Sequence, residues 1–183
     1  MKAVLISIQP EWCELIASGK KTVEVRKTKP KFVTAFTCYI YQTRKTWVYD
    51  IYSIIADWQG KVIGEFVCDE MFPIRVFENG SIQDYNFHGL GRSCVPYNDI
   101  SAYIGKDRTG YGWHISDLVI YDKPKELSGF YRGCEEPECD DCPYLHFENT
   151  PNSYEGWCTC DEKIPLKRPP QSWCYVERLG DAK

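Results

Sequence analysis

The sequence predicts a mainly β domain (α+β) with a few short helices, folded as a small β-barrel or rolled sheet. Short segments rich in β-forming residues recur along its 183 residues, and few segments show helical spacing of apolar residues. The regular alternation of strands and helices typical of a doubly wound sheet is missing. The 43% share of hydrophobic residues can build a core, and no stretch approaches the roughly 20 apolar residues of a membrane span.

The first quarter of the chain predicts three strands and one helix. Residues 3–8 form an apolar run and predict a buried strand. A helix begins at Pro10 and ends at Gly19. Residues 22–26 alternate between apolar and polar side chains and predict a half-buried strand, and residues 36–42 predict another. The apolar positions of the helix are Trp12, Leu15 and Ile16.

The rest of the chain predicts three further strands around a turn and a helix. Residues 61–68 follow a turn and predict a strand, and Asn79-Gly80 predicts another turn. A short helix is expected from a cap at residue 98 or 99 to residue 103. Residues 111–121 predict one long strand, and residues 173–179 predict a closing strand.

Residues 131–170 are rich in Cys, Pro, Asp and Glu and have little hydrophobic periodicity. We therefore divide the chain into a barrel at residues 1–130, a Cys-rich acidic extension at 131–170, and a closing strand and tail at 171–183. The C-x₂-C spacing within the extension is typical of structural zinc, which would order such a segment. Free thiols and disulfides are the alternatives, and no other cofactor is required. The candidate metal ligands are Cys134, Cys139, Cys142, Cys158 and Cys160.

Charge is unevenly distributed along a chain whose net charge is −4. Residues 1–49 hold nine basic and three acidic residues, a net charge of +6. Residues 134–162 hold nine acidic and no basic residues, a net charge of −9. The basic first quarter either faces an anionic partner such as nucleic acid or is a solvated surface. The negative total argues against non-specific binding to duplexes, which needs several phosphate contacts.

A lysine, a carboxylate and a guanidinium are expected to converge where the first helix leads into the second strand. Lys21 lies at this junction, just after the glycine that ends the helix. Glu24 and Arg26 are two residues apart on the strand, so they share a face with Thr22. Such a group can bind a polar heterocycle or a phosphate, and it can transfer a proton. The alternative is an exposed ladder of ion pairs.

This segment resembles the ASCH family, whose members are relatives of the PUA domain. The family motif G-x-K-x-x-E-x-R is met by Gly19, Lys21, Glu24 and Arg26. Residues 5–12 resemble the family's opening strand and helix, and residues 112–124 lie near its closing strand. The resemblance covers residues 3–130 and leaves out the Cys-rich extension.

The resemblance implies a PUA-like β-barrel with a cleft that binds RNA or a modified nucleoside. One bacterial branch of the family hydrolyses the acetyl amide of N4-acetylcytidine. Its lysine falls on Lys21 and its nucleophilic threonine falls on Glu24, so an enzyme of this kind would use Glu24 to activate water. That branch also uses a second acid, for which Glu65 and Glu70 are candidates.

Aromatic side chains and a histidine are candidates for the rest of such a site. Bases of single strands stack on aromatic faces, although aromatic residues also fill small cores. His114 is a candidate proton carrier or a hydrogen-bonded structural residue, and His88 lies in a loop that could cover the cleft. The candidates for stacking are Tyr111, Trp113 and Trp173, with Tyr41 and Trp12 as further ones.

The leading hypothesis is therefore a protein that binds RNA or a modified nucleoside. The alternatives are an amidohydrolase of an acylated nucleoside, with Lys21 and Glu24 catalytic, and a protein-interaction module that uses the acidic extension. No membrane partner is expected. Because the apolar start is short and lacks a cleavage site, we expect a cytoplasmic location. The predicted ligand-binding residues are Gly19, Lys21, Thr22, Glu24, Arg26, Tyr111, Trp113 and His114.

Overall fold

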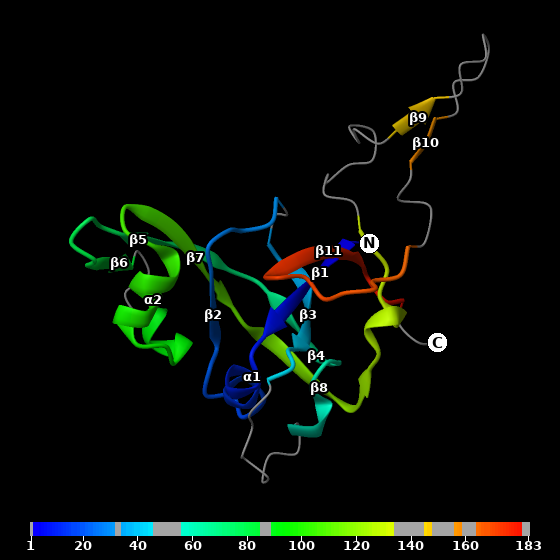
Figure 1. Ribbon diagram of the computed structural model, residues 1–183, viewed down its shortest axis with the longest axis horizontal. Coiled ribbons are helices and arrows are strands. Elements are labelled where there is room, and N and C mark those ends of the chain that lie inside the picture. The colour runs from blue at the N-terminus through cyan, green and yellow to red at the C-terminus, as the bar shows by residue number, and fades with distance from the viewer. Residues whose placement is uncertain are drawn as a thin grey trace.

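Two β-sheets and two α-helices make up most of the described part of the chain (Figure 1). The computed structural model describes residues 2–31, 34–45, 56–84, 89–133, 145–147, 156–158 and 164–180. The first sheet has the order β11-β1-β3-β4-β8, with β1 parallel to β3 and the other pairs antiparallel. Its strands are β11 (Trp173–Glu177), β1 (Lys2–Ile8), β3 (Phe36–Gln42), β4 (Val62–Cys68) and β8 (Ser116–Lys125).

The second sheet is antiparallel and has the order β2-β7-β5-β6. Its strands are β2 (Val23–Arg26), β7 (Arg108–His114), β5 (Met71–Val76) and β6 (Ile82–Asp84). The helices are α1 (Pro10–Ala17) and α2 (Tyr97–Ile104), and the 3₁₀ turns are η1 (Ala56–Trp58), η2 (Leu90–Ser93) and η3 (Leu127–Gly129). A separate antiparallel pair joins β9 (Leu145–Phe147) to β10 (Gly156–Cys158). None of the described helices is long and apolar enough to cross a bilayer.

The apolar run at residues 3–8 is buried on both faces of the first sheet. Val4 and Ile6 pack in a cluster with Trp113 and residues of α1, whereas Ala3 and Leu5 pack in a different cluster. Side chains of a strand alternate between the two faces, so a strand covered on both sides reads as continuously apolar. The prediction of a buried strand at residues 3–8 is confirmed, because β1 is covered on both faces.

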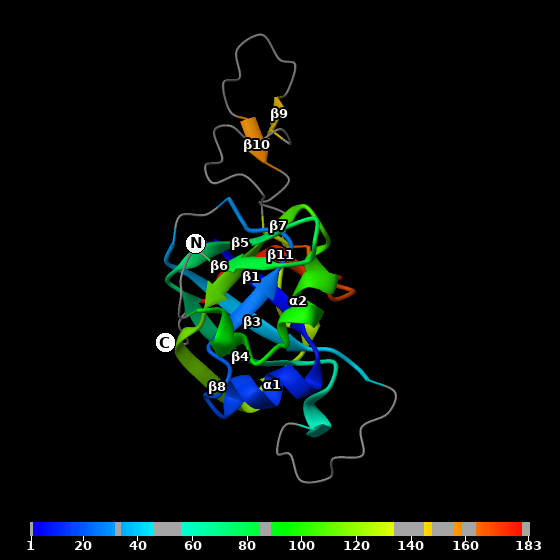
Figure 2. The same ribbon diagram turned by 90° about the vertical axis from the view of Figure 1, so that its left-hand side faces the viewer.

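α2 covers the second sheet, as Figures 1 and 2 show from two sides. Its buried residues Ile100 and Ile104 pack against Ile74 and Val76 of β5. Val23 and Val25 of β2 belong to the same cluster. One face of β2 is therefore apolar and held under α2, which leaves its other face to point toward the first sheet.

The predicted long strand at residues 111–121 is two strands that belong to different sheets. β7 ends at His114 and β8 begins at Ser116, and Asp117 has a positive φ of 45°. The N–H of Ile115, between the strands, donates to the carbonyl oxygen of Thr22 at 2.9 Å. The chain passes here from the second sheet to the first. The alternation of side chains along a strand does not indicate which strands it pairs with, so this change of sheet could not be predicted from the pattern.

The fold confirms the prediction of a mainly β domain with short helices and corrects the prediction of a barrel. The described strands form two larger sheets and the separate β9–β10 pair, and no closed barrel is found among them. The strand at residues 71–76 was not predicted from the sequence.

The zinc prediction is untested because its cysteines fall outside the described residues, apart from the backbone of Cys158 in β10. His88 also falls outside the described residues. The cysteines concerned are Cys134, Cys139, Cys142 and Cys160.

Gly64 allows β4 to lie close against β8. It pairs with Ile120 beside an irregularity in the β4–β8 ladder. A Cβ atom at Gly64 would overlap the carbonyl oxygen of Val119 and lie 3.1 Å from the Ile120 Cα. Both are backbone atoms of a paired strand, so they cannot move aside as a flexible side chain would.

We expect Gly64→Ala to lower the free energy of unfolding by about 1–3 kcal/mol, because it overpacks the β4–β8 interface. Chemical denaturation measures this change. Gly129→Ala is the control, since nothing lies within 4 Å of a Cβ at that position, and it should change stability by less than ~0.5 kcal/mol. Equal effects of the two substitutions would contradict the close approach.

Candidate functional site

Lys21 is buried at the junction between α1 and β2, with 1% of its surface exposed. Gly19 takes a positive φ of 70°, which lets the chain turn out of the helix. The Lys21 Nζ donates to the carbonyl oxygens of Val23 at 2.9 Å and Ser93 at 2.7 Å. It also lies 3.1 Å from Glu24 Oε2. Three oxygen atoms therefore surround an ammonium group that has three hydrogens to donate.

Glu24 joins this ammonium group to a guanidinium group. Its Oε1 lies 3.0 Å from Arg26 Nη2, while its Oε2 is bound to Lys21. Arg26 Nη2 also donates to the carbonyl oxygen of Ser7 at 2.7 Å, and Nη1 lies 3.3 Å from the Ser172 Oγ. The three motif side chains thus form one hydrogen-bonded cluster between β2 and the first sheet.

The cluster is buried, which corrects the prediction of a half-buried strand and excludes the exposed ladder of ion pairs. All four residues of β2 are buried, because α2 covers one face and the first sheet covers the other. Its polar face is therefore removed from water together with its apolar face. Removing each ion from water costs several kcal/mol, and this cost is offset only by close pairing and additional hydrogen bonds.

Two positive groups share one carboxylate, so the cluster of Lys21, Glu24 and Arg26 carries a net charge of +1. Within the described residues, the Arg26 Nε is buried and has no hydrogen-bond partner. A buried excess of positive charge has a strong effect at short range because the surrounding dielectric is low. It favours a ligand that presents oxygen acceptors or negative charge to it.

A cavity of about 400 Å³ lies against this cluster. Lys21, Glu24 and Arg26 form part of its wall, and Asp99 and Tyr103 of α2 form another part. Trp12 of α1 also lines the cavity, with the Lys21 Nζ 5.4 Å from the centroid of its ring. The remaining wall is formed by Ser7, Ile8, Gln9, Val25, Thr43, Val95, Ile100 and Gln171. The volume falls within the range of about 300–1,000 Å³ that is usual for small-molecule sites.

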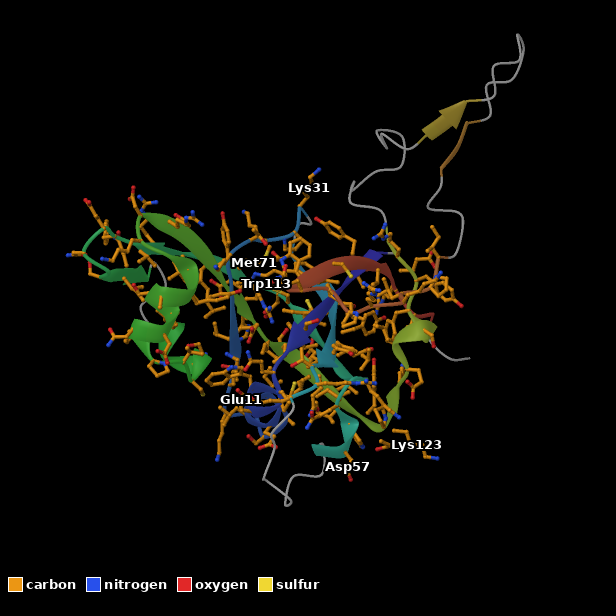
Figure 3. All side chains as sticks on the ribbon, in the orientation of Figure 1. Glu11, Lys31, Asp57, Met71, Trp113 and Lys123 are labelled. Atoms are coloured by element: carbon orange, nitrogen blue, oxygen red, sulfur yellow. The ribbon has the colours of Figure 1, made fainter. Side chains whose placement is uncertain are left out.

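Trp113 belongs to the core, which corrects the expectation that it stacks on a ligand. Its side chain has no exposed surface, and Figure 3 shows it in the interior of the molecule. Its ring centroid lies 5.9 Å from that of Phe36 and 5.8 Å from that of Trp173. A base has no access to a ring packed in this way. Tyr111 is half-buried under Lys29, whose Nζ lies 5.4 Å from the ring centroid, and Tyr111 does not line the cavity.

His114 lies outside the cavity and is bound to Asp69, with 2.6 Å between Nδ1 and Oδ1. Partial burial raises the pKa of the Asp69 carboxyl, but the hydrogen bonds from His114, the Asp69 backbone and Ser116, together with the electrostatic attraction of His114, leave the pKa below its usual value. Thr22 and Gly19 do not line the cavity either. Thr22 acts through its backbone, whose N–H donates to the carbonyl oxygen of Arg92 at 3.1 Å.

Neither candidate for a second acid reaches the cavity. Glu65 accepts a hydrogen bond from the Tyr121 hydroxyl at 2.5 Å, and the Glu70 carbonyl oxygen accepts from the N–H of His114. Besides Glu24, the carboxylate that lines the described wall of the cavity is Asp99. Asp99 and Tyr103 are four residues apart, and residues at this spacing lie on one face of a helix. The sequence therefore indicated that Asp99 and Tyr103 share a helix face, but it did not indicate that this face borders the cavity.

No metal centre is found in the part of the chain that the structure describes. There, no group of three or more His, Cys, Asp or Glu side chains is arranged to hold a metal ion. The cysteine side chains of the Cys-rich extension lie outside the described residues and are not tested by this observation.

Comparison with known proteins agrees with the resemblance inferred from the motif. Residues 6–78 match the family model described as ASCH domain, a region that includes Gly19–Arg26. The match does not extend to residues 112–124. No curated protein matches the chain.

Solved structures of an ASCH protein from Zymomonas mobilis have a similar fold. The protein itself is 23% identical with a TM-score of 0.50, and the alignment covers 68% of this chain and 73% of that one. A mutant of it is 23% identical with a TM-score of 0.51, covering 69% of this chain and 77% of that one. At this identity the likeness supports the ASCH-like fold.

We expect Glu24→Gln to lower the free energy of unfolding by about 3–5 kcal/mol, because it leaves two buried cations without a counter-charge. Chemical denaturation at neutral pH measures the loss. The control is Lys45→Gln, which breaks the exposed ion pair with Glu11 and should cost less than ~1 kcal/mol. A loss from Glu24→Gln as small as that of the control would contradict the buried cluster.

Proposed function

We propose, from the match of residues 6–78 to the ASCH domain, that this chain binds RNA or a modified nucleoside in the cavity beside β2. The observation that carries the proposal is the buried cluster of Lys21, Glu24 and Arg26 in the cavity wall, with its net positive charge. Nucleobases and riboses present carbonyl oxygens, amino groups and hydroxyls, which such a mixed cluster can recognise.

Glu24 and Arg26 retain hydrogen-bonding capacity for a ligand. A carboxylate offers about four lone-pair sites, and one site on each oxygen of Glu24 is taken by its cation. The free sites can accept from a base amino group or a ribose hydroxyl. Described residues use both hydrogens of Arg26 Nη2 and one of Nη1. The second Nη1 hydrogen can donate to a base carbonyl or a phosphate oxygen.

Aromatic side chains supply the stacking that holds an unpaired base. Trp12 and Tyr103 line the cavity from α1 and α2 respectively. Stacking of one base on an aromatic ring contributes about 1–3 kcal/mol. Trp12 was a further candidate for stacking from the sequence, whereas Tyr103 was not a candidate, and these two residues take the role first suggested for Tyr111 and Trp113.

A second candidate function is hydrolysis of an acylated nucleoside, which the position of Asp99 favours. Asp99 is exposed, lines the same cavity as Lys21 and Glu24, and forms no ion pair with another described residue. In this case Asp99 or Glu24 would activate water, and the positive cluster would stabilise charge developing on the amide oxygen.

We expect Tyr103→Ala to weaken binding of the best-bound ribonucleoside by about tenfold, since it removes one stacking surface. Calorimetric titration with adenosine, cytidine, guanosine, uridine and N4-acetylcytidine measures this. Tyr97→Ala is the matched control, because Tyr97 is exposed on the same helix but does not line the cavity. If no nucleoside or oligoribonucleotide binds, or if both variants behave alike, the proposed site is wrong.

Incubation with N4-acetylcytidine, followed by chromatography, separates the two candidate functions. Cytidine formed by the wild-type chain and not by Asp99→Asn would support the hydrolase. Complete recovery of N4-acetylcytidine at high protein concentration would leave binding as the function.

A further inference from the structure

A second and larger hollow, of about 890 Å³, adjoins the cavity beside β2. Ser7, Thr43 and Gln171 line both, so the two spaces meet around these three residues. The second hollow runs from this junction toward η3 and the segment that precedes β11. The two spaces are therefore adjacent, as a ligand longer than one nucleoside would need in order to contact both.

The second hollow carries positive charge that is not neutralised by described residues. Arg44 and Lys167 are exposed in its wall, and neither forms an ion pair with another described residue. The one carboxylate in the described wall, Glu126, is bound to Lys61, with 2.9 Å between the Lys61 Nζ and Oε1. The wall therefore holds two cations that no described residue neutralises, and their complement is an anionic ligand.

The rest of this wall suits the sugar and base faces of a nucleotide. Tyr41, Leu166 and the prolines at positions 165, 169 and 170 supply apolar surface. Burial raises the pKa of the Tyr41 hydroxyl, and the Arg44 guanidinium partly offsets this rise. The charge of Arg44 therefore acts at the Tyr41 hydroxyl, which is part of the wall that a ligand would contact.

We propose that the second hollow binds the phosphate and the neighbouring nucleotide of a single-stranded RNA whose preceding or following base occupies the cavity beside β2. Arg44 and Lys167 contact the phosphate backbone. The protein therefore recognises a nucleotide within a strand and binds it more tightly than the free nucleoside. This inference rests on the proposed function and adds a class of ligand to it.

The shared lining and the two cations without an ion-pair partner among the described residues together favour RNA over other long ligands. A phosphate follows every nucleotide of a strand. When one base occupies the cavity beside β2, a phosphate of the same strand therefore lies close to the two cations in the neighbouring hollow. The described wall offers two basic residues, in a chain with a net charge of −4, whereas binding to a duplex needs several phosphate contacts, so a short single strand is favoured.

The test compares each of ApA, CpC, GpG and UpU with its own nucleoside by calorimetric titration of the full chain. For the base that binds best, we expect the dinucleotide to bind about tenfold more tightly at low salt, since charge-assisted bonds to phosphate are added. The double variant Arg44→Gln/Lys167→Gln should reduce this gain to about twofold or less and leave nucleoside affinity unchanged. Both residues are exposed, so folding is not at risk.

The control is the double variant Lys45→Gln/Arg75→Gln, which removes the same charge from two residues that are already ion-paired and line neither space. It should keep the dinucleotide gain. A second measurement follows the affinity for a single-stranded hexaribonucleotide as the salt concentration rises. In the Arg44 and Lys167 variant, the slope of log affinity against log salt concentration should become shallower by about 1.4, or about 0.7 for each lost phosphate contact. The control should keep the slope of the wild-type chain.

The outcomes separate this inference from the proposed function. A dinucleotide that binds no better than its nucleoside, or a gain that survives loss of Arg44 and Lys167, overturns the inference and leaves the nucleoside site standing. Absence of binding by every nucleoside and oligonucleotide overturns both. Dinucleotide binding that does not weaken in Tyr103→Ala also overturns both, because the strand would then bypass the cavity beside β2.

Discussion

The carboxylate of Glu24 is the group on which the architecture of the site depends. It holds the ammonium of Lys21 and the guanidinium of Arg26 within an interior that would otherwise exclude both. The two cations in turn donate to the carbonyl oxygens of Ser93 and Ser7, which belong to η2 and β1. One buried ionic cluster therefore ties β2 to the first sheet and to the turn that leads into α2. The cavity lies where these parts meet.

A strand covered on both faces is ordinarily apolar, and β2 departs from this rule. Val23 and Val25 follow it on the side of α2, whereas the other face carries the charged pair that lines the cavity. Departures of this kind are expected at functional sites, where local stability is given up for chemistry. The local charge also differs from that of the whole molecule. The chain is acidic overall, yet the cavity and the hollow beside it bring basic groups together, and it is this local field that a ligand meets.

Much of the fold could be predicted because it depends on residues that are neighbours in the sequence. The apolar run at residues 3–8, the helix that ends at Gly19 and the turn at Asn79-Gly80 all appear where their local patterns place them. The break between β7 and β8 was missed, because it is set by the change of strand partners on either side of Ile115. The barrel was also predicted wrongly, since closure depends on pairings between distant strands.

The sequence by itself determined that Lys21, Glu24 and Arg26 meet, because a helix end and a strand of period two bring them to one face. Only the tertiary structure decided that this face is buried. The groups that cover it include Ser7 and Ser172, which lie 19 and 146 residues from Arg26 in the sequence. In the same way, the choice of which aromatic rings border the cavity and which fill the core was made by the packing of α1 and α2. That packing joins segments far apart in the chain, and no local pattern records it.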